Sequence, residues 1–374
     1  MDKAKVYFTD FRALPGTNLL LKLQRLMKTA GIGNIDMKDK FVAIKIHFGE
    51  PGNLSYLRPN YAKAVADVVK ELGGRPFLTD CNTLYVGRRK NALDHIDAAF
   101  ENGFTPYSTG CQVIIADGLK GTDEALVPVD GGTFVKEAKI GRAIMDADIF
   151  ISLSHFKGHE STGFGGALKN IGMGCGSRAG KMEQHCGGKP EVEQSACRGC
   201  HACAKNCAHG AISFSAEHKA SIDHSKCVGC GRCIGACNFD AIHNPNNSAN
   251  DELNIKIAEY SKAVLDGRPH FHISLVMDVS PFCDCHSEND APIIPDVGMF
   301  ASFDPVALDQ ACADACNRQP MMPNSRLADQ LKEHCCDHHD HFINNCPNTN
   351  WKVCLDHAEK IGIGSTQYEL VTIK

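Results

Sequence analysis

Residues 197–207 read C-R-G-C-H-A-C-A-K-N-C, and residues 227–237 read C-V-G-C-G-R-C-I-G-A-C. Each stretch has the spacing C-x2-C-x2-C-x3-C. The similarity continues past the cysteines, because A-H-G-A-I follows the first stretch and N-F-D-A-I follows the second. Ile212 and Ile242 therefore occupy equivalent positions. An internal repeat of this kind predicts a small structural unit with two similar halves.

This cysteine spacing is typical of bacterial ferredoxins with two 4Fe–4S clusters, in which the fourth cysteine of each run binds the other cluster. A short loop with a thiolate every third residue can reach three iron corners of a cubane, and the fourth ligand must come from elsewhere in the chain. We expect one cluster to be bound by Cys197, Cys200, Cys203 and Cys237, and the other by Cys207, Cys227, Cys230 and Cys233.

Two other interpretations of the cysteines were weighed. A zinc site uses four ligands and leaves the eight interlocked cysteines unexplained. A set of disulphides requires an oxidising compartment, for which nothing in the sequence argues. The proline that usually follows the fourth cysteine is replaced by Ala208 and Asn238, which removes a constraint on a turn but changes no ligand.

The composition is typical of a soluble globular protein, with 43% hydrophobic and 22% charged residues. A net charge of −5 without a long Lys/Arg run argues against general nucleic-acid binding. The first residues lack the apolar core of a signal peptide, and apolar runs such as 41–46 are too short to span a membrane. Twenty cysteines without an export signal predict a reducing, cytoplasmic location, and exposed clusters of this type favour an anaerobic cell.

Short apolar runs alternate with amphipathic segments on both sides of the cysteine-rich stretch. Predicted strands cover residues 6–8, 41–48, 75–79, 112–116, 148–154, 270–277 and 297–302. Predicted helices cover residues 18–30, 59–72, 90–102, 252–265, 304–316, 325–335 and 351–361. This alternation predicts an α/β fold with a mostly parallel sheet flanked by helices.

The economical domain organisation is one α/β domain interrupted by a ferredoxin-like α+β module with two clusters. The expected boundaries are 1–188 for the first part of the α/β domain, 189–246 for the inserted module, and 247–374 for the completing part. Two separate α/β domains are the alternative.

Polar side chains follow three of the predicted strands. His47 and Glu50 come after the strand at 41–48, Asp80 follows the strand at 75–79, and His155, Lys157 and His159 follow the strand at 148–154. Ligands of open α/β sheets bind beyond the carboxyl ends of strands, so we expect these groups to share one rim. A solvent-exposed loop is the alternative for any one of them.

Residues 154–185 contain seven glycines between Gly158 and Gly176, together with several cations. Glycine frees backbone N–H groups to form an anion-binding concavity, and lysine or arginine supplies charge. The expected pocket for a phosphate- or carboxylate-bearing ligand is formed by His47, Lys157, Gly165, Gly166, Lys169, Arg178 and Lys181. A tight, glycine-packed turn is the alternative. The segment lacks the sequence of a P-loop or a dinucleotide-binding motif.

A further metal site is a second hypothesis. Cys283, Cys285 and His286 lie within the sequence P-F-C-D-C-H, and Cys175 would complete a set of four soft ligands after folding. Solvent-exposed or buried structural roles are equally compatible with the pattern. The run at residues 335–341 fits a solvated helix end, and Cys312 and Cys316 fit buried thiols.

The motifs S-H-F-K-G-H-E-S-T-G-F-G-G-A-L-K-N-I-G-M-G-C at 154–175, K-I-H-F-G-E-P-G-N at 45–53 and S-F-D-P-V-A-L-D-Q-A at 302–311 closely resemble the "domain of unknown function 362" family. The resemblance covers nearly the whole chain. It implies an α/β domain carrying an inserted two-cluster ferredoxin module. It marks His47, Glu50, His155, Lys157, His159, Lys169 and Asp304 as positions of the family pattern, without implying a reaction.

We therefore expect an iron–sulphur electron-transfer protein, and an oxidoreductase if it is an enzyme. Two 4Fe–4S clusters would relay electrons between a redox partner protein or carrier and the α/β pocket. His155, His159 or His185 would move protons or bind metal there, and Glu50 or Asp80 would orient a histidine or act as base. An additional metal or a phosphate-bearing organic cofactor, including a flavin, is compatible with the pocket. The alternatives are a non-catalytic metal or iron–sulphur carrier and a ferredoxin with a structural α/β scaffold.

Overall fold

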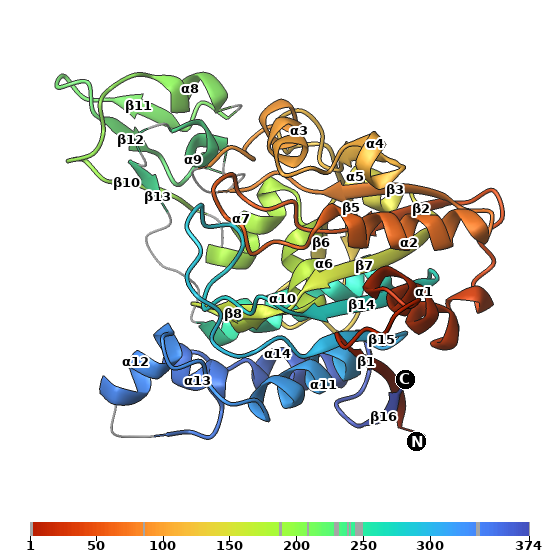
Figure 1. Ribbon diagram of the computed structural model, residues 1–374. Helices are drawn as coiled ribbons and strands as arrows, with labels where there is room; N and C mark the ends of the chain where they lie inside the picture. Colours follow the sequence, from red (N-terminus) through yellow and green to blue (C-terminus); the bar gives the residue numbers. More distant parts are fainter. Residues whose placement is uncertain are drawn as a thin grey trace.

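The computed structural model describes residues 3–373 except 85–86, 187–188, 208, 228–231, 238, 240, 244–249 and 334–336. The expected ligand Cys230 and the first residues of the run at 335–341 lie outside the described residues. Figure 1 shows an α/β body with a smaller cysteine-rich part at one edge.

A single eight-stranded sheet forms the centre of the molecule. Its order is β16 (Tyr368–Thr372), β1 (Ala4–Asp10), β15 (Gly298–Ser302), β14 (His270–Val276), β7 (Ile149–His155), β2 (Phe41–Lys45), β3 (Arg75–Asp80) and β4 (Gln112–Ile115). Only β15 runs antiparallel to its neighbours in this sheet. The prediction of an α/β fold with a mostly parallel sheet flanked by helices is therefore confirmed.

Helices cover both faces of the sheet because strand side chains alternate between them. In β2, Val42 and Ile44 join the core under α1 (Leu19–Thr29) and α2 (Pro59–Glu71). Ala43 faces the opposite core, which is covered by α6 (Ala167–Cys175), α10 (Asn250–Leu265), α11 (Pro305–Asn317) and α14 (Lys352–Lys360). The two chain ends lie close together, since β1 pairs with β16 (Figure 1).

The remaining elements are short. They are η1 (Ile32–Asn34), α3 (Ala92–Glu101), α4 (Pro106–Thr109), β5 (Glu124–Pro128), β6 (Glu137–Gly141), α5 (Arg142–Met145), β8 (Lys157–His159), β9 (Gly163–Gly165), α7 (Arg178–Cys186), α12 (Arg326–Glu333) and α13 (His341–Asn345). The glycine-rich stretch is thus a β8–β9 hairpin followed by two helices, rather than the simple turn weighed above.

The cysteine-rich segment forms its own small unit of strand pairs and helices (Figure 1, green). Its elements are β10 (Glu191–Val192), α8 (Ala202–Asn206), β11 (Ile212–Phe214), β12 (Ala220–Ile222), α9 (Arg232–Ala236) and β13 (Ile242–His243). Strand β10 pairs with β13, and β11 pairs with β12. The central sheet takes strands from both sides of this segment, β1, β2, β3, β4 and β7 before it and β14, β15 and β16 after it.

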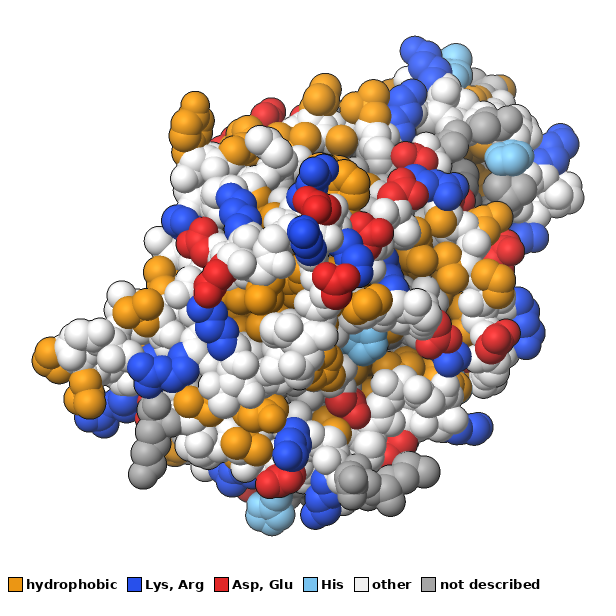
Figure 2. All heavy atoms as spheres, turned by 90° about the vertical axis from the view of Figure 1, so that its right-hand side faces the viewer, with side chains coloured by type: hydrophobic (Ala, Val, Ile, Leu, Met, Phe, Trp, Pro, Cys, Tyr) orange, Lys and Arg blue, Asp and Glu red, His pale blue; other side chains and the backbone are white. Residues whose placement is uncertain are grey.

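The order of the strands creates a crevice between β2 and β7. From β2 the chain passes through α2 to β3 on one side, whereas from β7 it eventually reaches β14 on the other side. Ligands of open α/β sheets bind at the carboxyl ends of strands where the order reverses in this way. Elsewhere on the surface, acidic and basic side chains are intermixed, as on the face in Figure 2.

Candidate functional site

A cavity of about 550 Å³ lies at the carboxyl ends of β2, β3 and β7. The three strand-end groups expected from the sequence meet there. The expected residues that line it are His47, Asp80, His155, Lys157, His159, Gly165, Gly166, Lys169, Lys181, His185, Cys283, Cys285 and His286. The wall also includes Leu84, Arg89 and His243, the last of which comes from β13 of the cysteine-rich segment.

Asp284 is the buried anchor of one side of the cavity. Its carboxylate lies 2.9 Å from Nδ1 of His155 and 3.0 Å from Nζ of Lys157. Burial alone would raise the pKa of Asp284, but the neighbouring His155 and Lys157 outweigh burial and lower it. The carboxylate is therefore held ionised beside His155 and Lys157.

His155 is fully engaged by the protein. While Nδ1 faces Asp284, Nε2 lies 2.8 Å from the carbonyl oxygen of Met277. Both partners are hydrogen-bond acceptors. Both ring nitrogens of His155 therefore already face protein oxygens, which favours a positioning role over the expected metal-binding or proton-moving role.

Asp80 forms a second buried ion pair. Nζ of Lys45 lies 2.9 Å from Oδ1 of Asp80 and donates to Oδ1 of Asn170 at 2.8 Å. The lysine and aspartate side chains are 1% and 5% exposed. Burial opposes ionisation of Asp80, but Lys45 lowers its pKa overall. Asp80 is thus charged and paired, and orients Lys45 at the cavity wall.

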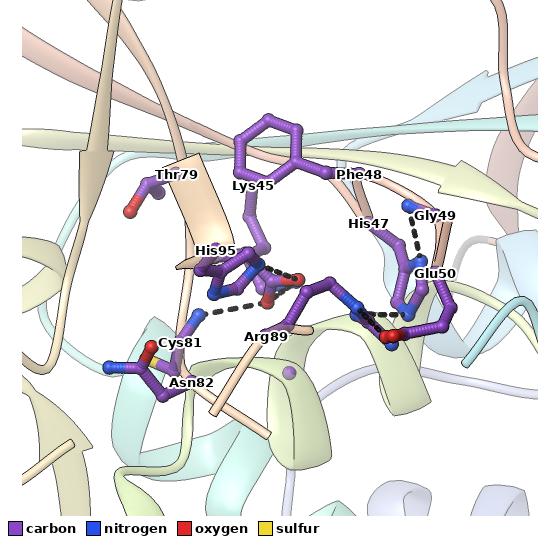
Figure 3. Close-up of polar contacts among 12 residues, drawn as sticks. Lys45, His47, Phe48, Gly49, Glu50, Thr79, Cys81, Asn82, Arg89 and His95 are labelled. Atoms are coloured by element: carbon purple, nitrogen blue, oxygen red, sulfur yellow. Dashed lines mark hydrogen bonds and ion pairs between the residues drawn. The ribbon is translucent and has the colours of Figure 1, made fainter. Parts of the chain in front are cut away.

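Glu50 and His47 are joined by Arg89 (Figure 3). Nε of Arg89 donates to Glu50 at 2.7 Å, and Nη1 lies 2.9 Å from Nε2 of His47. Burial and the neighbouring Arg89 lower the pKa of His47 well below its usual value, so the ring is neutral. Nη2 of Arg89 is buried and has no hydrogen-bond partner among the described residues. A buried donor at a cavity wall is a natural binding position for an anionic group.

Two thiols also line the cavity. Nζ of Lys169 lies 3.3 Å from Sγ of Cys283. A hydrogen bond from Cys285 and the charge of Lys169 lower the pKa of Cys283 well below its usual value, despite burial. The interaction with Cys283 raises the pKa of Cys285. Cys283 is therefore the thiolate of the pair and Cys285 the thiol.

His159 and His286 surround this pair of thiols. Nδ1 of His159 accepts from the backbone N–H groups of Ser161 and Thr162, so the hydrogen of a neutral ring lies on Nε2 and is available to Cys283. Nε2 of His286 lies 3.1 Å from Glu160, and this hydrogen bond raises the pKa of His286.

The glycines serve a different purpose from the one expected. The first N–H groups of α6, at Ala167 and Leu168, donate to the buried carboxylate of Asp309 at 2.6 and 2.9 Å. A side chain at Gly166 would collide with Asp309, and one at Gly165 would press on the stems of Lys157 and Lys169. The end of α6 is therefore already occupied by a protein carboxylate, and the glycines make room for Asp309 and the lysines.

Two of the expected residues, Arg178 and Cys175, do not line the cavity. The guanidinium of Arg178 donates to the carbonyl of Lys90. Cys175 lies beside Cys81, away from Cys283 and Cys285, so it does not join the expected set of four ligands. His185 does line the cavity, and burial next to Lys169 lowers its pKa to about 3.

The expected ligands of the first cluster surround a second, smaller cavity. Cys197, Cys200, Cys203 and Cys237 all line it. The N–H group of Ala220 points at Sγ of Cys197, at 3.4 Å. Leu84 and Met182 of the α/β body pack into the same apolar cluster as these cysteines, and Leu84 also lines the large cavity. Leu84 thus belongs both to the wall of the large cavity and to the apolar cluster that contains these cysteines.

In the part of the chain that the structure describes, no three His, Cys, Asp or Glu side chains converge closely enough to hold a single metal ion. A 4Fe–4S cluster does not require such convergence on one ion, because each thiolate binds a different iron atom of the cluster. Among the other cysteines, burial raises the pKa of Cys312, Cys316 and Cys354, so they are core thiols.

Fold and site together define an α/β protein with a charged, thiol-containing cavity at a strand crossover and a cysteine-lined unit beside it. The family model described as "Domain of unknown function (DUF362)" matches residues 42–314, and the chain belongs to this family. No helix among the described residues is both long and apolar enough to span a membrane.

The comparisons with individual proteins are distant. The thylakoid-associated protein sll1697 of Synechocystis is 27% identical over 168 residues, which cover 42% of this chain and 46% of that protein. The chain thus matches less than half of that relative's length. The lactate racemase apoprotein of Thermoanaerobacterium thermosaccharolyticum matches 74% of this chain and 51% of its own, at 11% identity and a TM-score of 0.36. A Thermotoga maritima protein matches 80% and 57%, at 14% identity and 0.39. At these TM-scores, neither structure supports a conclusion about this chain.

Sequence reasoning missed several residues of the site. Asp284 was hidden between two cysteines, and Arg89 lies in a loop with no motif. Asp309 is far from α6 in the chain, so only the fold could bring them together. Lys45 at the end of the apolar strand β2 is a signal present in the sequence, because a lysine in a buried strand requires a charged or polar partner.

Proposed function

We propose that this protein is an iron–sulphur electron-transfer protein, working as an oxidoreductase component with an anion-binding pocket in its α/β domain. The observation that carries the proposal is the cavity lined by Cys197, Cys200, Cys203 and Cys237. These are the four cysteines that the interlocked spacing assigns to one cluster, and the fourth comes from the other half of the repeat.

The residues around this cavity suit a 4Fe–4S cluster. Four thiols and the aromatic ring of Phe214 line it, and an N–H group points at a cysteine sulphur, as is common for cluster sulphurs. Cys207, Cys227 and Cys233, with Cys230 outside the described residues, would bind the second cluster. Bound there, clusters of this type accept and release single electrons.

The large cavity would hold the molecule that exchanges electrons with this unit. Nη2 of Arg89 is unpartnered among the described residues, and Lys169 and Lys181 line the same space. These groups favour a ligand with a carboxylate or phosphate. His159 presents a nitrogen-bound hydrogen toward Cys283 and could pass a proton to a bound ligand.

A carrier function has weaker support. The sequence suggested it through the surplus of cysteines, but Cys312, Cys316 and Cys354 are buried core thiols with raised pKa values. Thiols of this kind are poorly placed to bind and release metal.

The test is the iron and sulphide content of protein purified without oxygen. We expect about eight iron and eight sulphide per chain. Replacing Cys237 by serine should remove about four iron, whereas replacing the buried Cys312 by serine should remove none. Zinc in place of iron, or an unchanged iron content in Cys237→Ser, would contradict the proposal.

A further inference from the structure

Cys283 and Cys285 flank Asp284 in a turn that is fixed from several sides. The N–H group of His286 donates to the carbonyl of Cys283 at 3.1 Å, and the N–H group of Glu50 donates to the carbonyl of Asp284 at 3.0 Å. The Asp284 side chain is held by His155 and Lys157. The two thiols are therefore presented on a rigid support and do not depend on a mobile loop.

The thiols are separated by one residue, line the same cavity and differ in access. Cys283 is 3% exposed, whereas Cys285 is exposed. Lys169 lies 3.3 Å from the Cys283 sulphur. From this geometry we propose that Cys283 and Cys285 form a reversible disulphide and are the two-electron redox centre of the large cavity.

The charges around the pair favour the reduced state. The cationic or hydrogen-donating neighbours of Cys283 are Lys169 from α6, Lys157 and His159 from β8, and Cys285. The negative charge of Glu160 opposes the stabilisation of the thiolate, but Glu160 also pairs with His286. His47 and Arg89 interact with the two cysteines through their charges. A thiolate stabilised in this way makes the disulphide a stronger oxidant. The buried thiols of Cys312 and Cys354, whose pKa values are raised, lack this activation.

The redox step balances with one proton. On reduction the Cys283–Cys285 sulphur–sulphur bond breaks and two electrons enter. Sγ of Cys285 takes up a proton, and Sγ of Cys283 remains a thiolate beside Lys169. Oxidation reverses each change. In the experiment below, a dithiol supplies the two electrons. In the cell, the proposed iron–sulphur clusters would supply them one at a time. Only this cellular electron source rests on the proposed function.

The pair is also placed to receive electrons. The cavity that contains it is also lined by His243 of the cysteine-rich segment and by Leu84, which belongs to the same apolar cluster as Cys197 and Cys237. Such a centre would convert one-electron steps into a two-electron exchange. It fits a substrate reduced by two electrons, with its anionic group on Arg89.

The experiment equilibrates full-length, cluster-loaded protein without oxygen in mixtures of reduced and oxidised dithiothreitol. After rapid alkylation, mass spectrometry measures the fraction of Cys283 and Cys285 that remains free. We expect both thiols to be lost together, with a mass decrease of about two hydrogens, at a defined potential. Cys285→Ser should abolish this transition, and Cys312→Ser should leave it unchanged.

Lys169→Met tests the electrostatic part of the inference. Without the cation the thiolate is less stable, so the equilibrium constant for reduction should fall at least tenfold, which is 29.6 mV toward more negative potential for a two-electron couple. The exposed Lys63→Met is the matched control. Free thiols at every ratio, or a midpoint unmoved by Lys169→Met, would overturn the inference. Because iron and sulphide are measured separately, this failure is distinguishable from failure of the cluster proposal.

Discussion

Replacing Asp284 by asparagine should destabilise the fold strongly. The carboxylate is 1% exposed and lies 2.9 Å from His155 and 3.0 Å from Lys157, whose side chains are 2% and 8% exposed. Asparagine keeps the size but leaves the buried ammonium group of Lys157 without its counter-charge and removes the carboxylate that faces His155. Removing one partner of a buried pair costs about 3–5 kcal/mol. We expect a loss of this size in the free energy of unfolding at pH 7, measured by urea denaturation.

The matched control is Asp67→Asn, which removes an exposed i,i+4 pair with Lys63 and should cost only about 0.3–0.5 kcal/mol. The pH dependence provides a second check. The pKa of Asp284 is lowered from its ordinary 3.8, so its contribution is present above pH 3.8 and is lost as the pH falls through the lower folded value. The two proteins should therefore converge in strong acid. If Asp284→Asn costs no more than Asp67→Asn at pH 7, the reasoning is refuted.

Three further predictions concern packing, titration and binding. Gly172→Ala would place Cβ against the carbonyl of Ile257, so it should cost about 1–3 kcal/mol in thermal unfolding. Gly33→Ala would meet only the side chain of Leu72, at an ordinary van der Waals distance of 3.9 Å, and should be neutral; equal effects would contradict this. Burial raises the pKa of Asp309 to about 7, so between its unfolded and folded pKa values the folded state binds one more proton than the unfolded state. The free energy of unfolding should therefore fall by about 1 kcal/mol from pH 6 to pH 8. Asp309→Asn should remove this pH dependence. Arg89→Lys keeps the charge beside Glu50 but loses the free Nη2, so phosphate binding measured by calorimetry should weaken at least tenfold; unchanged affinity would place the anion elsewhere.

The sequence was informative where the signal is local. Apolar runs identified β2, β3, β7 and β14, because buried parallel strands are nearly continuous in hydrophobic residues. The strand-end positions of His47, Asp80 and His155 then predicted a shared rim, since carboxyl ends of parallel strands face the same way. Strand β16 and the β5–β6 hairpin were missed, because their alternation of apolar and polar residues is weak.

The chemical roles within the site were harder to predict. The cations near the glycine-rich stretch suggested a pocket built on a helix end, but that end is capped by Asp309, more than a hundred residues away along the chain. His155 was a candidate for chemistry, yet Met277 and Asp284 engage both its nitrogens. Each of these roles depends on contacts between distant segments, which residue spacing does not encode.

The arrangement of the central sheet has a consequence for synthesis of the chain. Ser152 of β7 bonds His272 of β14, 120 residues later, so β7 lacks one neighbour until β14 has been made. The whole cysteine-rich segment emerges in that interval. Because long-range strand pairing is slow and this segment carries its own strand pairs, it can fold before the sheet closes around its two ends. If the proposed clusters are inserted during translation, their insertion would then precede completion of the large cavity.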